Sequence, residues 1–233
     1  MPIYRIADLN IAIEPKTEFT ERYLNSYLYR DASRIDFSVV VTREMIEHES
    51  HLIPNAKVEI YETTAIFRKI CSQILKKYDG FFLHSSAIKY NGMAYLFTAP
   101  SGTGKSTHCG LWRQMLGDKV ISINDDKPII RKIDKQFYTF GNPWMGKENV
   151  GNNLKVPTGG VFILERSQTN SVEKINPVDN LSVLLNQTSC PTDKQSMLNL
   201  LSLLNDLFKA VPLYRLKCNM SYNAVKTVLS VIE

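Results

Sequence analysis

The order of hydrophobic and polar residues changes its period several times along the chain, and each period predicts a type of element. Residues 57–79 carry apolar side chains at roughly helical spacing, so we predict one long helix that stops at Gly80. Similar spacing recurs towards the carboxyl end. The predicted helices are 57–79, a helix that begins near Lys105 and is closed by Gly117, and helices over 178–187, 193–210 and 221–232.

Short runs of apolar or alternating residues, bounded by turn residues, predict strands. The predicted strands are 3–6, 11–13, 35–41, 81–90, 93–98, 119–123, 128–133, 136–140, 161–164 and 213–217. Asn91-Gly92 separates two of them and is a dipeptide that a two-residue type I′ hairpin favours. Asp134-Lys135 predicts a second hairpin. Strands mixed with helices predict an α/β fold, and the antiparallel hairpins predict a mixed β-sheet. The remainder of residues 1–55 is expected to be irregular.

The helix over 193–210 has a clear predicted start and face. Thr192, followed three residues later by Gln195, matches a capping box. Leucines follow at helical spacing and predict a broad apolar face that packs in the core. The predicted face consists of Leu198, Leu201, Leu204, Leu207 and Phe208.

The chain of 233 residues suits one large domain, or one domain with a small appendage. We divide it into a small β-rich N-terminal region, residues 1–56, and a larger domain, residues 57–233. The content of 44% apolar and 22% charged residues is ordinary for a soluble globular protein. It excludes a disordered tail, a collagen-like repeat and a coiled coil.

The apolar runs, the cysteines and the net charge indicate which classes of partner and which cellular location to expect. No apolar run reaches the roughly 18 residues of a membrane span, and the N-terminus lacks a signal-peptide pattern, so we expect no membrane partner. Four widely spaced cysteines without a CxxC pair favour a reducing, cytoplasmic location. A net charge of +5 permits an anionic ligand but is too weak and too scattered to predict nucleic-acid binding.

The stretch from Ala99 to Ser106, APSGTGKS, fits a Walker A loop except that alanine replaces the first glycine. Gly102 and Gly104 let successive N–H groups converge on an anion, and the N-terminus of the following helix adds partial positive charge. Lys105 can reach the β- and γ-phosphates, and the Ser106 hydroxyl can bind Mg²⁺. The alternative is a plain glycine-rich turn with a surface lysine. The predicted nucleotide-binding residues are Ser101, Gly102, Thr103, Gly104, Lys105, Ser106, Thr107 and Arg166.

Asp125 and Asp126 follow the next apolar strand, where a Walker B acid belongs. Two adjacent carboxylates indicate more than metal binding, since one can hold Mg²⁺ while the other accepts a proton from an alcohol. We assign Asp126, with Ser106, to the metal and Asp125 to the general base, and the sequence leaves the reverse open. A solvated acidic turn is the alternative.

His84, on the strand before Asn91-Gly92, is about as often structural as functional in such a place, and we count it with Lys105 among the catalytic residues.

The run LHSSAIKYNGMAYLFTAPSGTGKST, followed by SINDDKPIIR, resembles the catalytic core of HPr kinase/phosphorylase and, more distantly, of ATP-dependent phosphoenolpyruvate carboxykinase. The resemblance covers roughly residues 57–233. The short HPr kinase-related proteins found beside peptide-modification genes look most similar, also in GNPWMGKENVGNN and VPLYRLKC. The resemblance implies a P-loop core of this type and Mg-ATP as the phosphoryl donor. The chain is too short for a carboxykinase and lacks the long C-terminal helices by which HPr kinase grips HPr.

We therefore expect an ATP-dependent kinase that transfers the γ-phosphoryl group of Mg-ATP to a hydroxyl acceptor. The acceptor is a serine or threonine of a peptide or protein, or a small hydroxylated molecule. Residues 57–233 then form the HPr kinase-like ATP-binding catalytic domain, and we expect residues 1–56 to shape the acceptor side. Two other functions stay open: a P-loop NTP hydrolase that acts as a switch, and a non-catalytic module that senses nucleotide or binds a peptide. The base preference and the oligomeric state, a homo-oligomer included, also stay open.

Three further segments carry weaker signals. Residues 141–153 are polar and glycine-rich; Trp144 can line an acceptor pocket, and Lys147 and Glu148 can touch phosphate or substrate, although an ordinary surface loop is the alternative. Arg166 can steady the transferring phosphoryl group or form a solvated strand end. Residues 47–51, EHESH, lack both HExxH spacing and a helix with the correct face, so they predict a solvated segment rather than a metal site.

Overall fold

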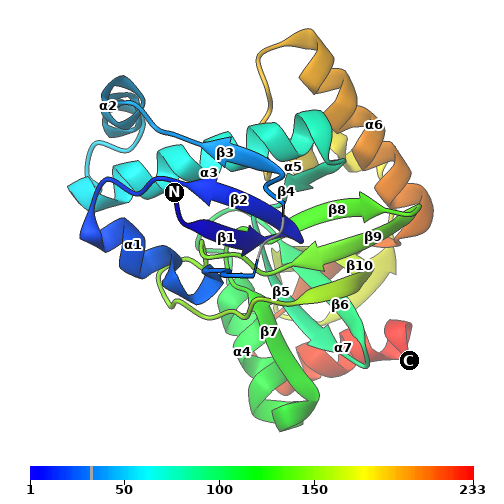
Figure 1. The fold of residues 1–233 in the computed structure, drawn as a ribbon. Coiled ribbons are helices and arrows are strands. Elements are labelled where there is room, and N and C mark those ends of the chain that lie inside the picture. Colours follow the sequence, from blue (N-terminus) through cyan, green and yellow to red (C-terminus); the bar gives the residue numbers. More distant parts are fainter. Residues whose placement is uncertain (32–33) are drawn as a thin grey trace.

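The computed structural model describes residues 1–31 and 34–233 as helices packed around a curled β-sheet (Figure 1). The helices are α1 (Glu18–Leu24), α2 (Arg43–Leu52), α3 (Val58–Lys77), α4 (Lys105–Leu116), α5 (Leu181–Leu185), α6 (Lys194–Ala210) and α7 (Tyr222–Ile232). The strands are β1 (Ile3–Ile6), β2 (Leu9–Ile13), β3 (Phe37–Val39), β4 (Gly80–Phe82), β5 (Ser85–Tyr90), β6 (Met93–Thr98), β7 (Val120–Asn124), β8 (Ile129–Ile133), β9 (Gln136–Phe140), β10 (Lys155–Arg166), β11 (Ser171–Lys174) and β12 (Leu213–Cys218). The predicted α/β class with a mixed sheet is confirmed.

Strand β10 lies at the centre of the nine-stranded main sheet. The sheet order is β4-β8-β9-β10-β6-β5-β7, with β12 beside β10 and β11 beside β12. Residues Lys155–Pro157 of β10 pair antiparallel with β9, whereas its later residues pair in parallel with β6 and β12. A register shift between Thr158 and Gly160 separates the two halves. The strand is 12 residues long, well beyond the predicted 161–164, because proline and glycine obscure its first half in the sequence.

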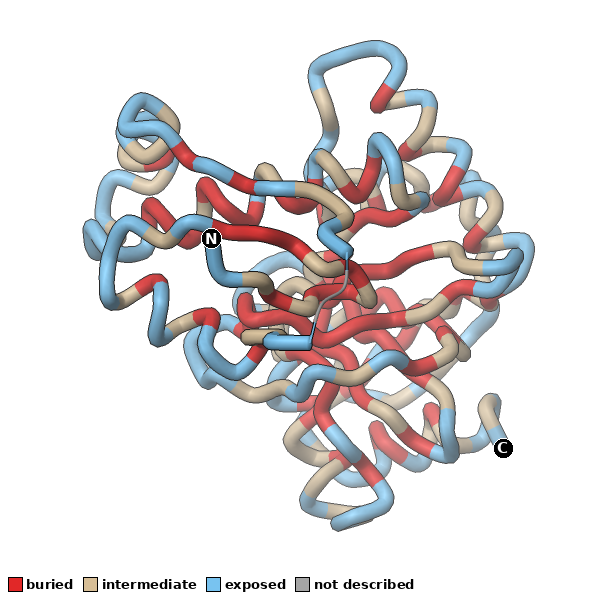
Figure 2. The backbone as a smooth tube through the Cα atoms, viewed as in Figure 1, coloured by how far each residue is buried: buried red, intermediate tan, exposed pale blue. Residues whose placement is uncertain are grey.

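Alternate residues of β10 point to opposite faces of the sheet, and different helices cover each face. Phe162 and Leu164 pack with α4 and α7, while Val161 and Ile163 pack with α5 and α6. Figure 2 shows buried positions concentrated along the central strands. The hydrophobic core therefore lies on both sides of the sheet.

The N-terminal residues form a second sheet, β1-β2-β3, which shares one core with α3 and the β8–β9 hairpin. Helices α1 and α2 also belong here, so the expectation of irregular structure between the strands is wrong. Both helices are short and polar, and both begin after a threonine, Thr17 or Thr42, whose hydroxyl caps a main-chain N–H of the first turn. Buried Glu62 of α3 fastens α1: it accepts hydrogen bonds from the hydroxyls of Thr17 and Thr20 at 2.8 and 2.7 Å.

The hairpin between β5 and β6 forms as predicted, from Ser85 paired with Thr98 to the turn at Asn91-Gly92. Both turn residues have positive φ, 47° and 78°, as a type I′ turn requires. The predicted strand 81–90 is interrupted, however. Its first part belongs to β4 and pairs with β8, and His84 lies in the break between β4 and β5.

Helix α6 begins one residue later than the capping-box prediction requires. Its N-cap is Asp193, whose carboxylate accepts a hydrogen bond from the Ser196 N–H at 2.9 Å, so the proposed box of Thr192 and Gln195 is wrong. Leu198 is 50% exposed, and the buried leucines of α6 are Leu200, Leu203, Leu204 and Leu207. Neither α6 nor any other helix of the described residues is long and apolar enough to cross a membrane.

Candidate active site

Three strands bring the predicted site residues to one edge of the main sheet. β5 runs antiparallel between β6 and β7, so the carboxyl ends of β6 and β7 lie beside the amino end of β5. The glycine-bearing loop leaves β6 there, the acidic pair follows β7, and His84 precedes β5. The Thr98 hydroxyl donates to the His84 carbonyl at 2.9 Å, and the Ser85 N–H donates to the Asp126 carbonyl at 3.0 Å. The topology therefore explains why residues from three segments meet.

The loop of residues 99–104, which we call the glycine loop, curls through two left-handed glycines. The φ angle is 78° at Gly102 and 118° at Gly104, and a Cβ at either position would meet nothing within 4 Å. Backbone conformation, rather than space, requires glycine here. Gly104 is the N-cap of α4, and no side chain caps this end. The first N–H groups of the helix, with the exposed Ser106 and Thr107, therefore form a surface that favours an anion.

Lys105 is held by the glycine loop rather than extended into solvent. Its side chain is buried, and the ammonium donates to the carbonyls of Ala99 at 2.8 Å and Pro100 at 3.4 Å. Burial lowers the pKa of Lys105, and the nearby carboxylates of Asp126 and Asp125 oppose this shift. The charges of Lys105 and of the two aspartates thus act on one another.

Arg166, at the end of β10, braces the glycine loop from outside. Its guanidinium donates to the carbonyl of Thr103 at 3.0 Å and to the carbonyl of Gly102. These contacts engage the carbonyl side of the loop and leave its N–H groups available. In this structure Arg166 therefore positions the loop, while its predicted contact with a phosphoryl group stays a prediction.

Two buried asparagines hold the acidic turn, and the sequence reasoning missed both. The Asn124 side chain accepts hydrogen bonds from the N–H groups of Asp126 and Lys127 at 2.9 and 2.7 Å. Its amide donates to the Asn142 carbonyl at 3.1 Å, and the Asn142 amide donates back to the Lys127 carbonyl at 2.6 Å. Both side chains are fully buried. The signal in the sequence is an asparagine at or just beyond the end of each of two strands, a position where Asx turns are common.

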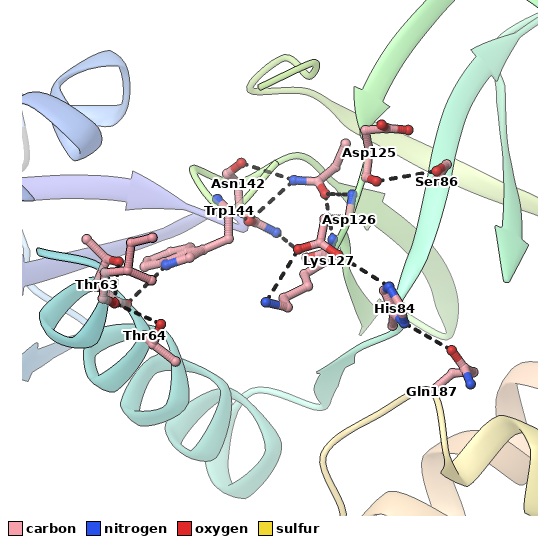
Figure 3. Close-up of polar contacts among 12 residues, drawn as sticks. Thr63, Thr64, His84, Ser86, Asp125, Asp126, Lys127, Asn142, Trp144 and Gln187 are labelled. Carbon is pink, nitrogen blue, oxygen red and sulfur yellow. Dashed lines mark hydrogen bonds and ion pairs between the residues drawn. The ribbon is translucent and has the colours of Figure 1, made fainter. Parts of the chain in front are cut away.

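The Asp126 carboxylate faces two side chains that can carry positive charge (Figure 3). His84 Nε2 lies 3.4 Å from one oxygen, and Lys127 Nζ lies 3.4 Å from the other. Gln187 holds His84 from the far side through two contacts. The imidazole Nδ1 and the Gln187 side-chain oxygen are 3.0 Å apart, and the main-chain N–H of His84 donates to the main-chain carbonyl of Gln187 at 2.6 Å. Burial and the Lys105 charge lower the pKa of His84, so its imidazole is neutral near pH 7.

Asp125 turns its carboxylate away from Asp126 and His84 (Figure 3). Its carbonyl accepts a hydrogen bond from the Ser86 hydroxyl at 3.3 Å. Burial raises the pKa of the Cys109 thiol on α4, and the negative charge of Asp125 raises it further. The two aspartates therefore face different parts of the site.

Trp144 is a core residue, which corrects the prediction that it lines an acceptor pocket. Its side chain is 5% exposed, and its indole N–H donates to the Thr63 carbonyl of α3 at 3.0 Å. The ring packs 4.8 Å from the Phe67 ring, centre to centre. The aromatic side chain fills the space between α3 and the loop, so it is not free to contact a ligand.

Gly146 brings the same loop against the acidic turn. It has φ 76°, and a Cβ there would lie 3.0 Å from the Cβ of Asp126. Lys147 and Glu148 follow directly and are exposed. They therefore stay candidates for substrate contact, on the segment that crosses over Asp126.

Two cavities border this edge of the sheet. One, of about 430 Å³, lies beside the glycine loop and is lined also by Leu111 of α4, Leu164 of β10 and Met220 after β12. His108, another lining residue that the sequence reasoning missed, is 3% exposed and accepts a hydrogen bond from the Trp112 indole at 3.0 Å. The other, of about 360 Å³, lies between α3, β4 and residues 188–193.

The segment 47–51 lies within α2, and Glu49 is buried, so the prediction of a solvated segment is wrong at Glu49. Buried Glu49 pairs with Arg68 of α3 at 2.5 Å. Among the residues that the structure describes, no group of three or more His, Cys, Asp and Glu side chains is placed to hold a metal ion.

No protein-family model and no curated protein matches the chain. Among solved structures, the chain is similar to the HPr(Ser) kinase/phosphatase from Coxiella burnetii, with 11% sequence identity and a TM-score of 0.35. The match covers 64% of this chain and 94% of that chain. These values describe a distant likeness in fold. The roles of individual residues therefore rest on the geometry of this chain.

Proposed function

We propose that the protein is an ATP-dependent kinase that transfers the γ-phosphoryl group of Mg-ATP to a hydroxyl acceptor. One observation carries the proposal. Lys105 is buried and held by the glycine loop at the start of α4, an end that no side chain caps, and the charges of Asp125 and Asp126 act on it. Phosphoryl transfer needs positive groups for the phosphates and a base for the acceptor. This edge of the sheet offers both.

The glycine loop and the start of α4 bind the phosphates in this proposal. Lys105 exchanges its hydrogen bonds to Ala99 and Pro100 for phosphate oxygens, and main-chain N–H groups supply the remaining donors. The cavity of about 430 Å³ beside the loop has room and apolar lining for the nucleoside. Arg166 keeps the loop in its binding conformation.

The chemistry of the donors fits Mg²⁺ bound together with nucleotide. Mg²⁺ prefers oxygen ligands and usually takes one or two carboxylates, water and substrate phosphates. The exposed Ser106 hydroxyl on α4 and the Asp125 carboxylate, whose charge acts on Cys109 of α4, supply such oxygens in this proposal. When bound, the ion neutralises charge on the phosphates.

The Asp126 carboxylate then takes the proton of the acceptor hydroxyl, the reverse of the order we assigned from sequence. It lies against His84 and Lys127, beside the cavity that does not border the glycine loop. The acceptor oxygen forms a bond to the γ-phosphorus, the bond to the β-phosphate oxygen breaks, and ADP leaves. Gln187 holds the His84 ring beside this carboxylate, with Nε2 3.4 Å from one of its oxygens.

The test uses ATP labelled in the γ-phosphate, with separate measurement of nucleotide affinity, free phosphate and labelled acceptor. Lys105→Met should lower turnover by about 10²-fold or more, since charge stabilisation dominates phosphoryl transfer. Lys119→Met, an exposed lysine beyond the end of α4, is the matched control and should leave turnover unchanged.

The acidic pair separates a kinase from a hydrolase. Asp126→Asn should keep nucleotide affinity and lose acceptor labelling by about 10²–10⁴-fold, while Asp125→Asn should weaken Mg-ATP binding and lower every reaction. Free phosphate without any labelled acceptor, and equal losses in both variants, would favour a hydrolase that acts as a switch. Nucleotide binding with no turnover would favour a sensing module.

A further inference from the structure

The cavity of about 360 Å³ between α3, β4 and residues 188–193, called the acceptor cavity from here on, is joined to the acidic turn by two contacts. Lys127 lines the cavity, and its ammonium lies 3.4 Å from the Asp126 carboxylate. Gln187, which directly precedes the cavity wall at Thr188, binds His84 by main chain and side chain. Figure 3 shows Lys127 pointing from the acidic turn towards α3. The Asp126 carboxylate therefore lies one side chain, that of Lys127, away from this cavity.

Cations outnumber carboxylates among the residues that line the acceptor cavity, although Glu49 and Asp126, outside the lining, pair with two of the three cations. Arg68, Lys76 and Lys127 line it, against a single carboxylate, that of Asp193. Lys76 and Asp193 are half exposed and 3.8 Å apart, which makes their pairing weak. Arg68 uses its Nε on buried Glu49, which leaves other guanidinium N–H groups. Hydroxyl-bearing residues of α3 and of the 188–193 segment add neutral donors.

The inner wall of the acceptor cavity is aromatic. Phe67 of α3 and Phe81 and Phe82 of β4 line it. Phe67 and Phe82 pack against each other at 5.1 Å between ring centres, and the Lys127 ammonium lies 5.7 Å from the Phe67 ring centre. The cavity thus combines an apolar wall with a cationic rim, a combination that recognises an anion attached to an apolar body.

We infer that the phosphoryl acceptor is a hydroxyl compound that also carries an acidic group, a carboxylate or a phosphate. The inference rests on the proposed function and names the substrate class of that site. The acidic group binds at the rim formed by Arg68, Lys76 and Lys127, the apolar part lies on the phenylalanines, and the hydroxyl reaches Asp126. A neutral acceptor gains nothing from the rim, and a cationic one is repelled by it.

The experiment measures phosphoryl transfer from labelled ATP to matched pairs of probes that differ only in charge. One arm uses small molecules, N-acetyl-L-serine with N-acetyl-L-serine amide. The other uses a short single-serine peptide with two glutamates and its glutamine analogue. We expect kcat/KM to be at least about tenfold higher for the acidic member of a pair. The arm that is labelled identifies whether the source is a small hydroxy acid or an acidic peptide.

Two neighbouring lysines of α3 provide the variant and its control. Lys76→Glu reverses a charge at the rim and should lower kcat/KM for the acidic probe by about tenfold, with ATP affinity and ATP hydrolysis unchanged. Lys77→Glu makes the same change on an exposed residue outside the cavity and should have no effect. Ser72→Trp, at an exposed lining position, should block transfer by bulk alone while hydrolysis persists.

Equal labelling of acidic and neutral probes, or equal losses in Lys76→Glu and Lys77→Glu, would overturn the inference. So would the absence of transfer to every acidic probe while Lys105-dependent ATP hydrolysis persists. If ATP turnover does not depend on Lys105 at all, the proposed function itself fails, so the two failures are distinguishable.

Discussion

His108 offers a test of how the start of α4 is held behind the glycine loop. Burial of the imidazole lowers the pKa of His108 from 6.5 to about 4. The Trp112 indole donates to its Nε2 at 3.0 Å, and its Nδ1 is buried without a partner among the described residues. The neutral form satisfies the tryptophan, whereas the protonated form loses that acceptor and places a charge in the core.

The sign and size of the pH effect follow from these two pKa values. The unfolded chain binds this proton below about pH 6.5, and the folded chain binds it only near about pH 4, so folding stability falls as the pH drops through this window. At about 1.4 kcal/mol per pKa unit, the full loss is about 3 kcal/mol. At about pH 5.5, most carboxyl groups are still ionised, and the loss is about 1.4 kcal/mol.

The assay is denaturant unfolding of the wild type and of His108→Gln at about pH 8 and about pH 5.5. Glutamine keeps an acceptor for Trp112 but does not titrate in this range. We expect the free energy of unfolding of the wild type to fall by about 1.4 kcal/mol more than that of the variant. Parallel pH dependences in the two proteins would refute the reasoning, because His108 would then not be a buried neutral group.

Three further outcomes are expected from the glycine loop and the N-terminal part. Arg166→Met should weaken nucleotide binding about fivefold, measured by titration, because two loop carbonyls lose their donor, while thermal stability hardly changes. Gly104→Ala should cost about 1–3 kcal/mol in unfolding experiments because φ is 118°, whereas Gly110→Ala, inside α4, where a Cβ would meet only the Arg113 side chain at 3.9 Å, should stabilise slightly. Glu62→Gln should lower the free energy of unfolding by about 2–3 kcal/mol, because a buried acceptor of two hydroxyls loses its charge; an unchanged denaturation midpoint would contradict this role.

Local sequence chemistry predicts the hairpins and the glycine loop well. Asn91-Gly92 and Asp134-Lys135 both adopt positive φ, and Gly102 and Gly104 do so in the loop. Each of these conformations is decided by the residues that adopt it, so the sequence carries the information locally. The acidic pair follows the same logic, because it terminates a short apolar strand.

The remaining features depend on partners far along the chain. The position of Trp144 in a polar loop predicts a ligand contact. In the structure, however, its ring packs on Phe67 of α3 and its indole N–H donates to a main-chain carbonyl of α3. A lysine in a loop is expected to be exposed, but Lys105 is buried and its ammonium binds a loop carbonyl. The buried role of Asn142 requires Lys127 and Asn124, and the brace from Arg166 requires the parallel pairing of β10 with β6. The periodicity of apolar residues does not predict such contacts between residues that are far apart in the sequence.

The double pairing of β10 also sets the order in which the chain can fold. The hairpins β5–β6 and β8–β9 join neighbouring segments and need only short loops to close, whereas β10 must find β6 and β12 across long stretches of chain. Closing such loops costs entropy before any contact is gained, so we expect the docking of β10 to limit the folding rate. Val161→Ala, at a residue that takes part in both parallel pairings, should accordingly slow refolding more than it speeds unfolding in stopped-flow experiments. Because β10 ends in Arg166, the same slow step also completes the glycine loop, and the capacity to bind nucleotide should appear together with the native sheet rather than before it.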